Sequence, residues 1–163
     1  MSWKLPLLTL LAAMQVVAAP NASETEHIAT MYATYRAAFP DVPEVTVETL
    51  DTLKAPVFVD VRTAPEQAVS MLPGALTIEE FTAQQAALAG RPIVAYCTIG
   101  ARSGEWAQAR REEGIEAYNL VGSLLAWTHA GGALEAPDGS ATKRVHVYGK
   151  TWDLAADGYE STW

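Results

Sequence analysis

The sequence predicts an α/β fold, an open parallel β-sheet flanked by helices on both faces, with an N-terminal helix and a C-terminal extension added. Short apolar runs, each closed by turn residues, alternate with helical segments of about ten residues, which is typical of parallel sheets with crossover helices. The chain has 163 residues and 50% of them are hydrophobic. It is therefore long enough for one domain with its own core.

The first expected element is a helix over residues 23–39. Its apolar side chains fall on one face, Ser23 is placed to cap its start, and Pro40 ends it. Residues 45–53 are expected to form a short helical or turn segment.

The strands of the sheet are expected over residues 56–62, 92–97 and 116–120. The first two are continuous apolar runs, a pattern that predicts strands buried on both faces of a parallel sheet. Thr63 is expected to cap a short helix after the first strand. The longer helices are expected over residues 77–88, 103–113 and 123–130.

The tail of the chain has a different character. Polar and apolar residues alternate over residues 144–148, which predicts an edge strand or a clamp on the surface. Three aromatic residues, Trp152, Tyr159 and Trp163, could anchor this extension. The tail is therefore expected to pack on the domain that precedes it.

The first residues resemble a secretory signal peptide, expected over residues 1–18. Lys4 gives an early positive charge, residues 5–19 form an apolar stretch, and a cut after Ala18 fits the preference for small residues. The protein is thus expected to be exported, either periplasmic or secreted; the alternative is an uncleaved membrane anchor. The remaining segments are an N-terminal helical segment at 19–44, the main domain at 45–134 and the C-terminal extension at 135–163.

The charge balance and the residue spacings exclude several partners. The chain has 11 basic and 19 acidic residues, a net charge of -8, and no basic cluster, so nucleic acid is not an expected partner. No spacing of a metal site and no glycine-rich phosphate loop occurs, so no metal and no cofactor is expected. The single cysteine cannot form an internal disulfide, so its thiol is free, paired with another chain or reactive.

Cys97 is the residue that points most directly to chemistry. It ends an apolar strand and is followed by a short loop with Gly100 and Arg102, after which a helix is expected. Unpaired N–H groups at a helix start and a nearby guanidinium both lower the pKa of a thiol, and the thiolate is the nucleophile. An inert cysteine buried in the core is the alternative interpretation.

Three stretches of sequence carry a resemblance to a known family. They are Val59-Asp60-Val61-Arg62 with Glu66 and Pro73-Gly74-Ala75, then Tyr96-Cys97-Thr98-Ile99-Gly100-Ala101-Arg102-Ser103, and then Asn119-Leu120-Val121-Gly122 with Ala126-Trp127. In this order they resemble the N-terminal signature, the active-site loop and the C-terminal signature of the rhodanese-like domain family, the single-domain sulfurtransferases. The resemblance covers about residues 45 to 134.

The resemblance implies that Cys97 takes a sulfane sulfur from a donor such as thiosulfate, forms a persulfide and passes the sulfur to a nucleophile. The donor is thus expected to be a small sulfur-containing anion, and the acceptor cyanide, a thiol or a protein. The loop implied to bind the substrate consists of Thr98, Ile99, Gly100, Ala101, Arg102 and Ser103.

Alternative roles remain open for the polar residues near this loop. Arg102 could pair with an anionic donor or form a salt bridge that holds the loop together. Arg62 is expected either near the entrance for the substrate or in a structural network with Asp60. For Asp60 itself, structural support is the expected role. Ser103 is expected to be an N-cap and not a catalytic hydroxyl.

Other functions also remain open. A related fold carries cysteine-dependent phosphatases and arsenate reductases, whose loop between Cys and Arg is one residue longer. The shorter loop between Cys97 and Arg102 favours a single sulfur over a tetrahedral oxyanion. A non-catalytic binding module is another alternative, and a redox function is weakened by the lack of a second cysteine.

Overall fold

The computed structural model describes residues 22–163. The expected signal segment at residues 1–18 lies outside the described residues, so its cleavage stays a prediction. Within residues 22–163, no helix is both long and apolar enough to cross a lipid bilayer.

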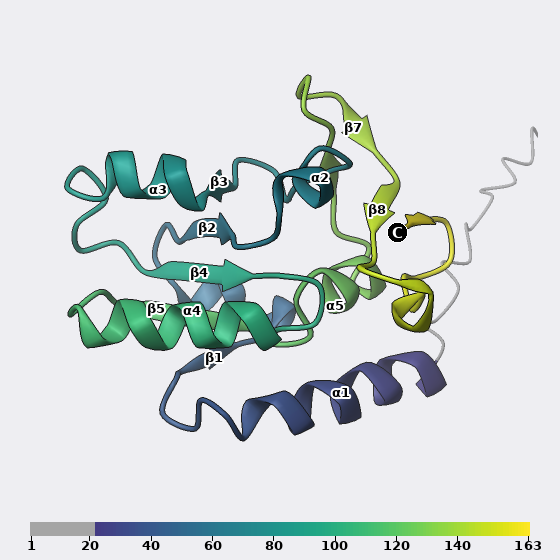
Figure 1. Cartoon of the computed structure of the whole chain (residues 1–163), viewed down its shortest axis with the longest axis horizontal. Helices are drawn as coiled ribbons and strands as arrows, with labels where there is room; N and C mark the ends of the chain where they lie inside the picture. Colours follow the sequence, from purple (N-terminus) through teal and green to yellow (C-terminus); the bar gives the residue numbers. More distant parts are fainter. Residues whose placement is uncertain (1–21) are drawn as a thin grey trace, which may run out of the picture.

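A five-stranded parallel sheet forms the centre of the molecule (Figure 1). Its strands lie in the order β1-β5-β4-β2-β3, and every neighbouring pair is parallel. The expected open parallel sheet is therefore confirmed. The two outer strands are only two residues long, too short to produce a period in the sequence. The strands are β1 (Glu44–Val45), β2 (Val57–Asp60), β3 (Leu76–Thr77), β4 (Ile93–Tyr96) and β5 (Ala117–Leu120).

Helices connect these strands and cover the sheet. In the described residues they are α1 (Ala22–Arg36), η1 (Val47–Thr52), α2 (Ala64–Gln67), α3 (Ile78–Gln84), α4 (Ala101–Glu112), α5 (Ser123–His129) and η2 (Lys150–Trp152), of which η1 and η2 are 3₁₀ helices. α1 already includes Ser23, which is therefore not its cap. α3 ends earlier than the expected residue 88, and its start is fixed by Thr77, whose hydroxyl accepts from the Glu80 N–H.

Both faces of the sheet are covered by helices. The side chains of β4 alternate between the two faces and therefore contribute to two separate cores. Val94 and Tyr96 belong to a core shared with α1 and α5. Ile93 and Ala95 belong to a second core under α3 and α4, and α4 crosses the viewer's side of the sheet in Figure 1. These β4 residues are fully or nearly fully buried, and burying an aliphatic side chain contributes about 2 kcal/mol.

The chain that follows α1 packs tightly on α4. Phe39 is 1% exposed, and a Cβ placed on Gly104 would lie 2.2 Å from its ring. Glycine is therefore required at this position of α4, since any side chain would displace Phe39. The N-terminal segment thus forms part of the second core.

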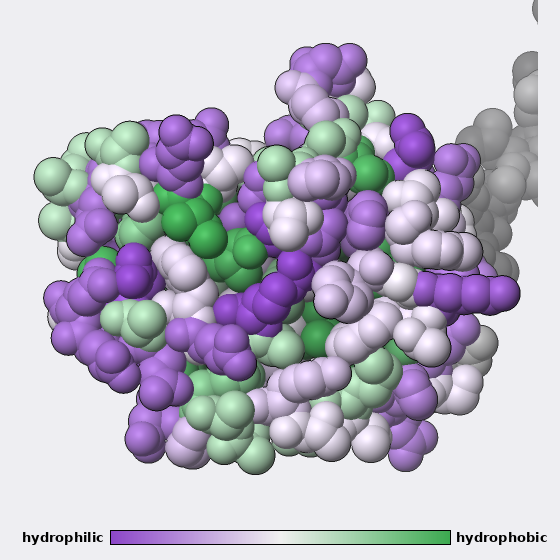
Figure 2. Space-filling view, viewed as in Figure 1, coloured by the Kyte–Doolittle hydropathy of each residue, from purple (hydrophilic) through white to green (hydrophobic). Residues whose placement is uncertain are grey.

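The C-terminal extension packs against the other core. Strand β8 (Arg144–His146) pairs in parallel with β9 (Glu160–Thr162), and Val145 and Val147 are both 0% exposed within the core that contains α5. The hairpin of β6 (Leu134–Glu135) and β7 (Ala141–Thr142) precedes them, and its hydrophilic turn stands above the rest of the surface in Figure 2. In Figure 1 this extension lies at the carboxyl ends of β2 and β4, where open parallel sheets bind ligands.

Candidate functional site

Cys97 follows directly after β4, at the amino end of α4. Its side chain is almost entirely buried, at 1% exposure, and its Sγ accepts a hydrogen bond from the Gly100 N–H at 3.1 Å. Gly100 has a φ of 110°, and a Cβ there would lie 2.5 Å from the Tyr32 ring. Only glycine fits this turn, which directs a backbone N–H onto the sulfur.

The surroundings of Cys97 favour its thiolate. Burial raises the pKa of the thiol, but hydrogen bonds from Ser103 and Gly100 and the positive charge of Arg102 lower it, so that the pKa lies below its ordinary value. The unpaired N–H groups and the positive dipole end of α4 act in the same direction. These groups therefore favour the ionised form of Cys97, which is the form in which a thiol acts as a nucleophile.

Ser103 is not the N-cap that the sequence suggested. Gly100 is the N-cap residue of α4, because its left-handed backbone starts the helix earlier, so Ser103 lies within the first turn. Its hydroxyl donates to Asn119 Oδ1 at 2.6 Å and lies 3.6 Å from Cys97 Sγ. Ser103 thus lies against the sulfur with its orientation fixed by Asn119.

Two further residues support the loop, and sequence reasoning did not assign either of them a role. The Ser123 hydroxyl accepts the Cys97 N–H at 3.1 Å. The Asn119 side chain donates to the Gly100 carbonyl at 2.8 Å and to the Tyr32 hydroxyl at 3.1 Å. Asn119 opens the stretch Asn119-Leu120-Val121-Gly122 that carries the family resemblance, and Ser123 follows this stretch directly. Their place in the sequence was the one signal that could have pointed to a role at the site.

Arg102 forms a salt bridge with Glu66. Its Nη1 and Nη2 donate to the two carboxylate oxygens at 2.8 Å and 2.7 Å, and Nη2 also lies 3.3 Å from Thr98 Oγ1. Burial raises the pKa of Glu66, but hydrogen bonds from Arg102 and Thr63 lower it by more, to about 2. The hydrogen bond to Glu66 is the main cause that raises the pKa of Arg102. Of the two expected roles, the structure contains the salt bridge.

Of the two positions expected for Arg62, the structure shows the structural network with Asp60. Its guanidinium Nη2 lies 2.7 Å from Asp60 Oδ2, and both side chains are 0% exposed. The same nitrogen donates to the Ser70 carbonyl, and the Tyr96 hydroxyl donates to Asp60 at 2.7 Å. Arg62 comes just after β2, and its guanidinium folds back onto the carboxylate of Asp60, two residues earlier in the chain. Asp60 and Arg62 therefore form a buried structural pair.

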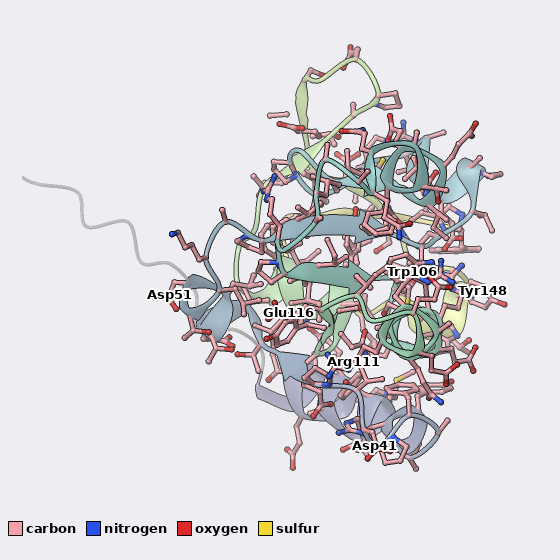
Figure 3. The ribbon with its side chains drawn as sticks, turned by 90° about the vertical axis from the view of Figure 1, so that its left-hand side faces the viewer. Asp41, Asp51, Trp106, Arg111, Glu116 and Tyr148 are labelled. Carbon is pink, nitrogen blue, oxygen red and sulfur yellow. The ribbon has the colours of Figure 1, made fainter. Side chains whose placement is uncertain are left out.

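A cavity of about 190 Å³ opens above Cys97. Three of its lining residues are aromatic and form what we call the aromatic wall: Tyr35 from α1, and Tyr148 and Trp152 from the C-terminal extension. The Trp152 ring lies 6.0 Å from the rings of both tyrosines. Figure 3 shows Tyr148 at the outer edge of the molecule, on the side of α4. The cavity is also lined by Cys97, Thr98, Ile99, Ala101 and Arg102.

Most of the expected loop residues therefore lie together at the cavity. Gly100 and Ser103 are the exceptions, since they contact the sulfur from its inner side. No pattern in the sequence predicted the position of the aromatic wall, because its members come from distant segments with no motif of their own. Among residues 22–163, no group of three or more His, Cys, Asp or Glu side chains is placed to hold a metal ion.

Known proteins share this fold. The Rhodanese-like domain family matches residues 44–130. A thiosulfate sulfurtransferase structure from Pseudomonas aeruginosa aligns with 69% of this chain and 23% of its own chain, at 21% identity and a TM-score of 0.52. A structure from Rhodopseudomonas palustris, described as a protein of unknown function and possible tyrosine phosphatase, aligns with 66% of this chain and 93% of its own, at 21% identity and a TM-score of 0.50. A comparison with curated protein sequences finds no match.

The fold and the site together define an α/β domain with one cysteine held between the end of a central strand and the start of a helix. At identities of 21%, the two solved structures show the similarity of fold alone. The family match covers more than half of the sequence, and the chain belongs to the rhodanese-like domain family.

Proposed function

We propose that this protein is a sulfurtransferase that carries a sulfane sulfur as a persulfide on Cys97. The observation that supports this most is the position of Cys97 Sγ, which accepts the Gly100 N–H at 3.1 Å at the start of α4. A persulfide carries its negative charge on the outer sulfur, and N–H groups at a helix start favour such an anion. The pKa of Cys97 lies below its ordinary value, which favours the thiolate that attacks the donor.

The first half of the reaction forms the persulfide. The Cys97 thiolate attacks the sulfane sulfur of a small anionic donor, a new S–S bond forms, and the bond from that sulfur to the rest of the donor breaks. With thiosulfate, the leaving group is sulfite, which takes the electron pair of the broken bond. No external oxidant or reductant is needed, because the sulfur is transferred without a net change in electrons.

The second half returns the free enzyme. A nucleophilic acceptor, such as cyanide, a thiol or a protein thiol, attacks the outer sulfur, and Cys97 leaves as a thiolate. Cyanide would leave as thiocyanate. Covalent catalysis of this kind has two separate half-reactions and shows ping-pong kinetics.

The proposal is tested by the intact mass of the protein after incubation with thiosulfate or with the organic donor benzenethiosulfonate. We expect a gain of one sulfur atom that cyanide reverses, and no gain for Cys97→Ser, which is nearly isosteric and keeps the backbone hydrogen bonds of the loop. If the protein gains no sulfur from either donor, it is no sulfurtransferase and a non-catalytic binding module becomes the better reading.

A phosphatase reaction fits the site less well. A phosphate would need a guanidinium free to bind its oxygens, whereas both terminal nitrogens of Arg102 already bind Glu66. The cavity is small, about 190 Å³, and its wall is aromatic. Lack of turnover with p-nitrophenyl phosphate, measured on the same sample that forms the persulfide, would agree with this argument.

A further inference from the structure

We infer that the preferred donor is a monoanion that carries its sulfane sulfur on a second sulfur atom, which in turn bears a small apolar organic group, as in an organic thiosulfonate or persulfide. We further infer that the aromatic wall selects such a donor over inorganic thiosulfate. This inference rests on the proposed function, because it names the substrate class of the same site. It assigns Tyr148 and Trp152 as specificity-determining residues.

The first argument is the origin of the aromatic wall. Tyr35, Tyr148 and Trp152 all line the cavity of Cys97, yet all three lie outside the family match at residues 44–130. The segments that flank the domain thus supply the outer surface of its site. The rings of such a wall offer a large apolar contact area to an organic group, which the small dianion thiosulfate cannot use.

The second argument is the charge of the cavity. Arg102 is the cation among the lining residues, and Glu66 neutralises it with two hydrogen bonds of 2.8 Å and 2.7 Å. Its guanidinium carbon also lies 5.2 Å from the centre of the Tyr148 ring. A thiosulfate dianion would meet no unpaired cation there, and the chain as a whole carries a net charge of -8. A monoanion with an apolar body has less charge to desolvate.

The third argument is size. An apolar cavity of about 150 Å³ is large enough to hold benzene in a known protein. The cavity above Cys97 has about 190 Å³, so a phenyl or a similar small group fits beside the aromatic wall. Tyr148 is 60% exposed and lies at the outer edge of the cavity, where a donor would enter.

The transfer from such donors balances in the same way as before. With a thiosulfonate, the Cys97 thiolate takes the outer sulfur and a sulfinate leaves with the electron pair. With an organic persulfide, the thiolate takes the outer sulfur and the organic thiolate leaves, carrying the electron pair and then a proton. Both reactions yield the Cys97 persulfide and need no further reactant.

The experiment compares kcat/KM for benzenethiosulfonate and for thiosulfate, with cyanide as the common acceptor. Because sulfinate and sulfite differ as leaving groups, the ratio for the same two donors with a free thiol in solution is measured alongside. We expect the enzyme to prefer benzenethiosulfonate by about tenfold or more beyond that solution ratio, which is the size of a discrimination made by apolar contacts.

The variants Trp152→Ala and Tyr148→Ala test which residues produce this preference. Each should lower the enzyme's donor ratio by about fivefold or more, mainly by raising KM for benzenethiosulfonate. Trp163→Ala is the matched control, since Trp163 is 58% exposed and does not line the cavity. Tyr148→Ala removes a largely exposed side chain, so it stays informative if Trp152→Ala fails to fold.

The outcomes separate the two proposals. If neither donor gives a persulfide, the proposed function itself fails. If both donors give a persulfide but the enzyme follows the solution ratio, or if the wall variants keep the wild-type ratio, the sulfurtransferase proposal stands and the inference about the donor is wrong.

Discussion

Arg62 and Arg102 each pair with a carboxylate near the carboxyl end of the sheet, but the two pairs differ in burial. Arg62 and Asp60 are two residues apart, and both side chains are 0% exposed. Arg102 reaches across from α4 to Glu66 on α2, and its side chain is 33% exposed. The first pair lies beneath the loops, whereas the second lies beside Cys97 at the cavity.

The comparison teaches that the position of a pair, and not its chemistry, decides its role. A fully buried pair leaves a charge without a partner in a dry environment when one member is lost, which is strongly unfavourable. A pair at a cavity can change its partner or its hydration, so it tunes the groups around it at a smaller cost in stability. Three predictions test this contrast, from the largest expected effect to the smallest.

The largest effect is expected for Arg62→Met. This change leaves the Asp60 carboxylate buried without its main partner, so the free energy of unfolding should fall by about 3–5 kcal/mol. Urea denaturation measures the loss. Arg110→Met is the control, because the Arg110–Glu113 pair is partly exposed and should contribute about 1 kcal/mol or less. Equal losses in the two variants would remove the contrast.

The second effect is the loss of stability in acid through Glu66. The pKa of this carboxyl is lowered from 4.5 to about 2 in the folded protein, so its pair with Arg102 stabilises the fold above 4.5 and the contribution disappears as the pH falls toward 2. We expect a loss of about 2 kcal/mol over this interval, reduced from the full shift because Arg102 is partly exposed.

The measurement is urea denaturation at several pH values within that window. Glu66→Gln should be less stable than the wild type at neutral pH and should lose less stability on acidification, so that the two curves approach each other. Parallel curves would mean that other carboxylates cause the acid sensitivity and that Glu66 has no special part in it.

The smallest effect concerns the thiol. The positive charge of Arg102 helps to lower the pKa of Cys97, so removing that charge should raise this pKa. The informative comparison is Glu66→Gln against the double variant Glu66→Gln/Arg102→Gln, because neither leaves an unpaired carboxylate beside the thiol. The rate of alkylation by iodoacetamide against pH gives the pKa of each. Identical midpoints would show that Arg102 does not act on the thiol.

The parts of the site that follow from contiguous residues could be predicted from the sequence. The strand before Cys97 is an apolar run, and the turn after it needs the left-handed backbone that Gly100 provides. Strand, turn and helix start thus place the thiol near unpaired N–H groups through local geometry alone. The same local rules predicted the α/β class, because the alternation of strands and helices repeats along the chain.

The parts that depend on distant residues could not be predicted. The start of α4 at Ala101 moves Ser103 from the cap into the first turn, and Asn119 on β5 accepts a hydrogen bond from its hydroxyl there. The partner of Arg102 depends on where α2 lies, and the aromatic wall joins α1 with the C-terminal extension. No pattern within one segment encodes such contacts, since they arise from the tertiary packing of several.

The close packing of two glycines has a consequence for how the chain divides into units. Tyr32 and Phe39, both outside the family match at residues 44–130, lie against the bare backbone of Gly100 and Gly104. A fragment with residues 44–130 alone would leave both glycines and their apolar surroundings open to water. We expect such a fragment to bind the dye 1-anilinonaphthalene-8-sulfonate, as loosely packed proteins do, while residues 22–163 do not. The boundary that sequence similarity draws around this domain therefore cuts through its folding unit, and shuffling of the domain between proteins would have to carry the preceding helix with it.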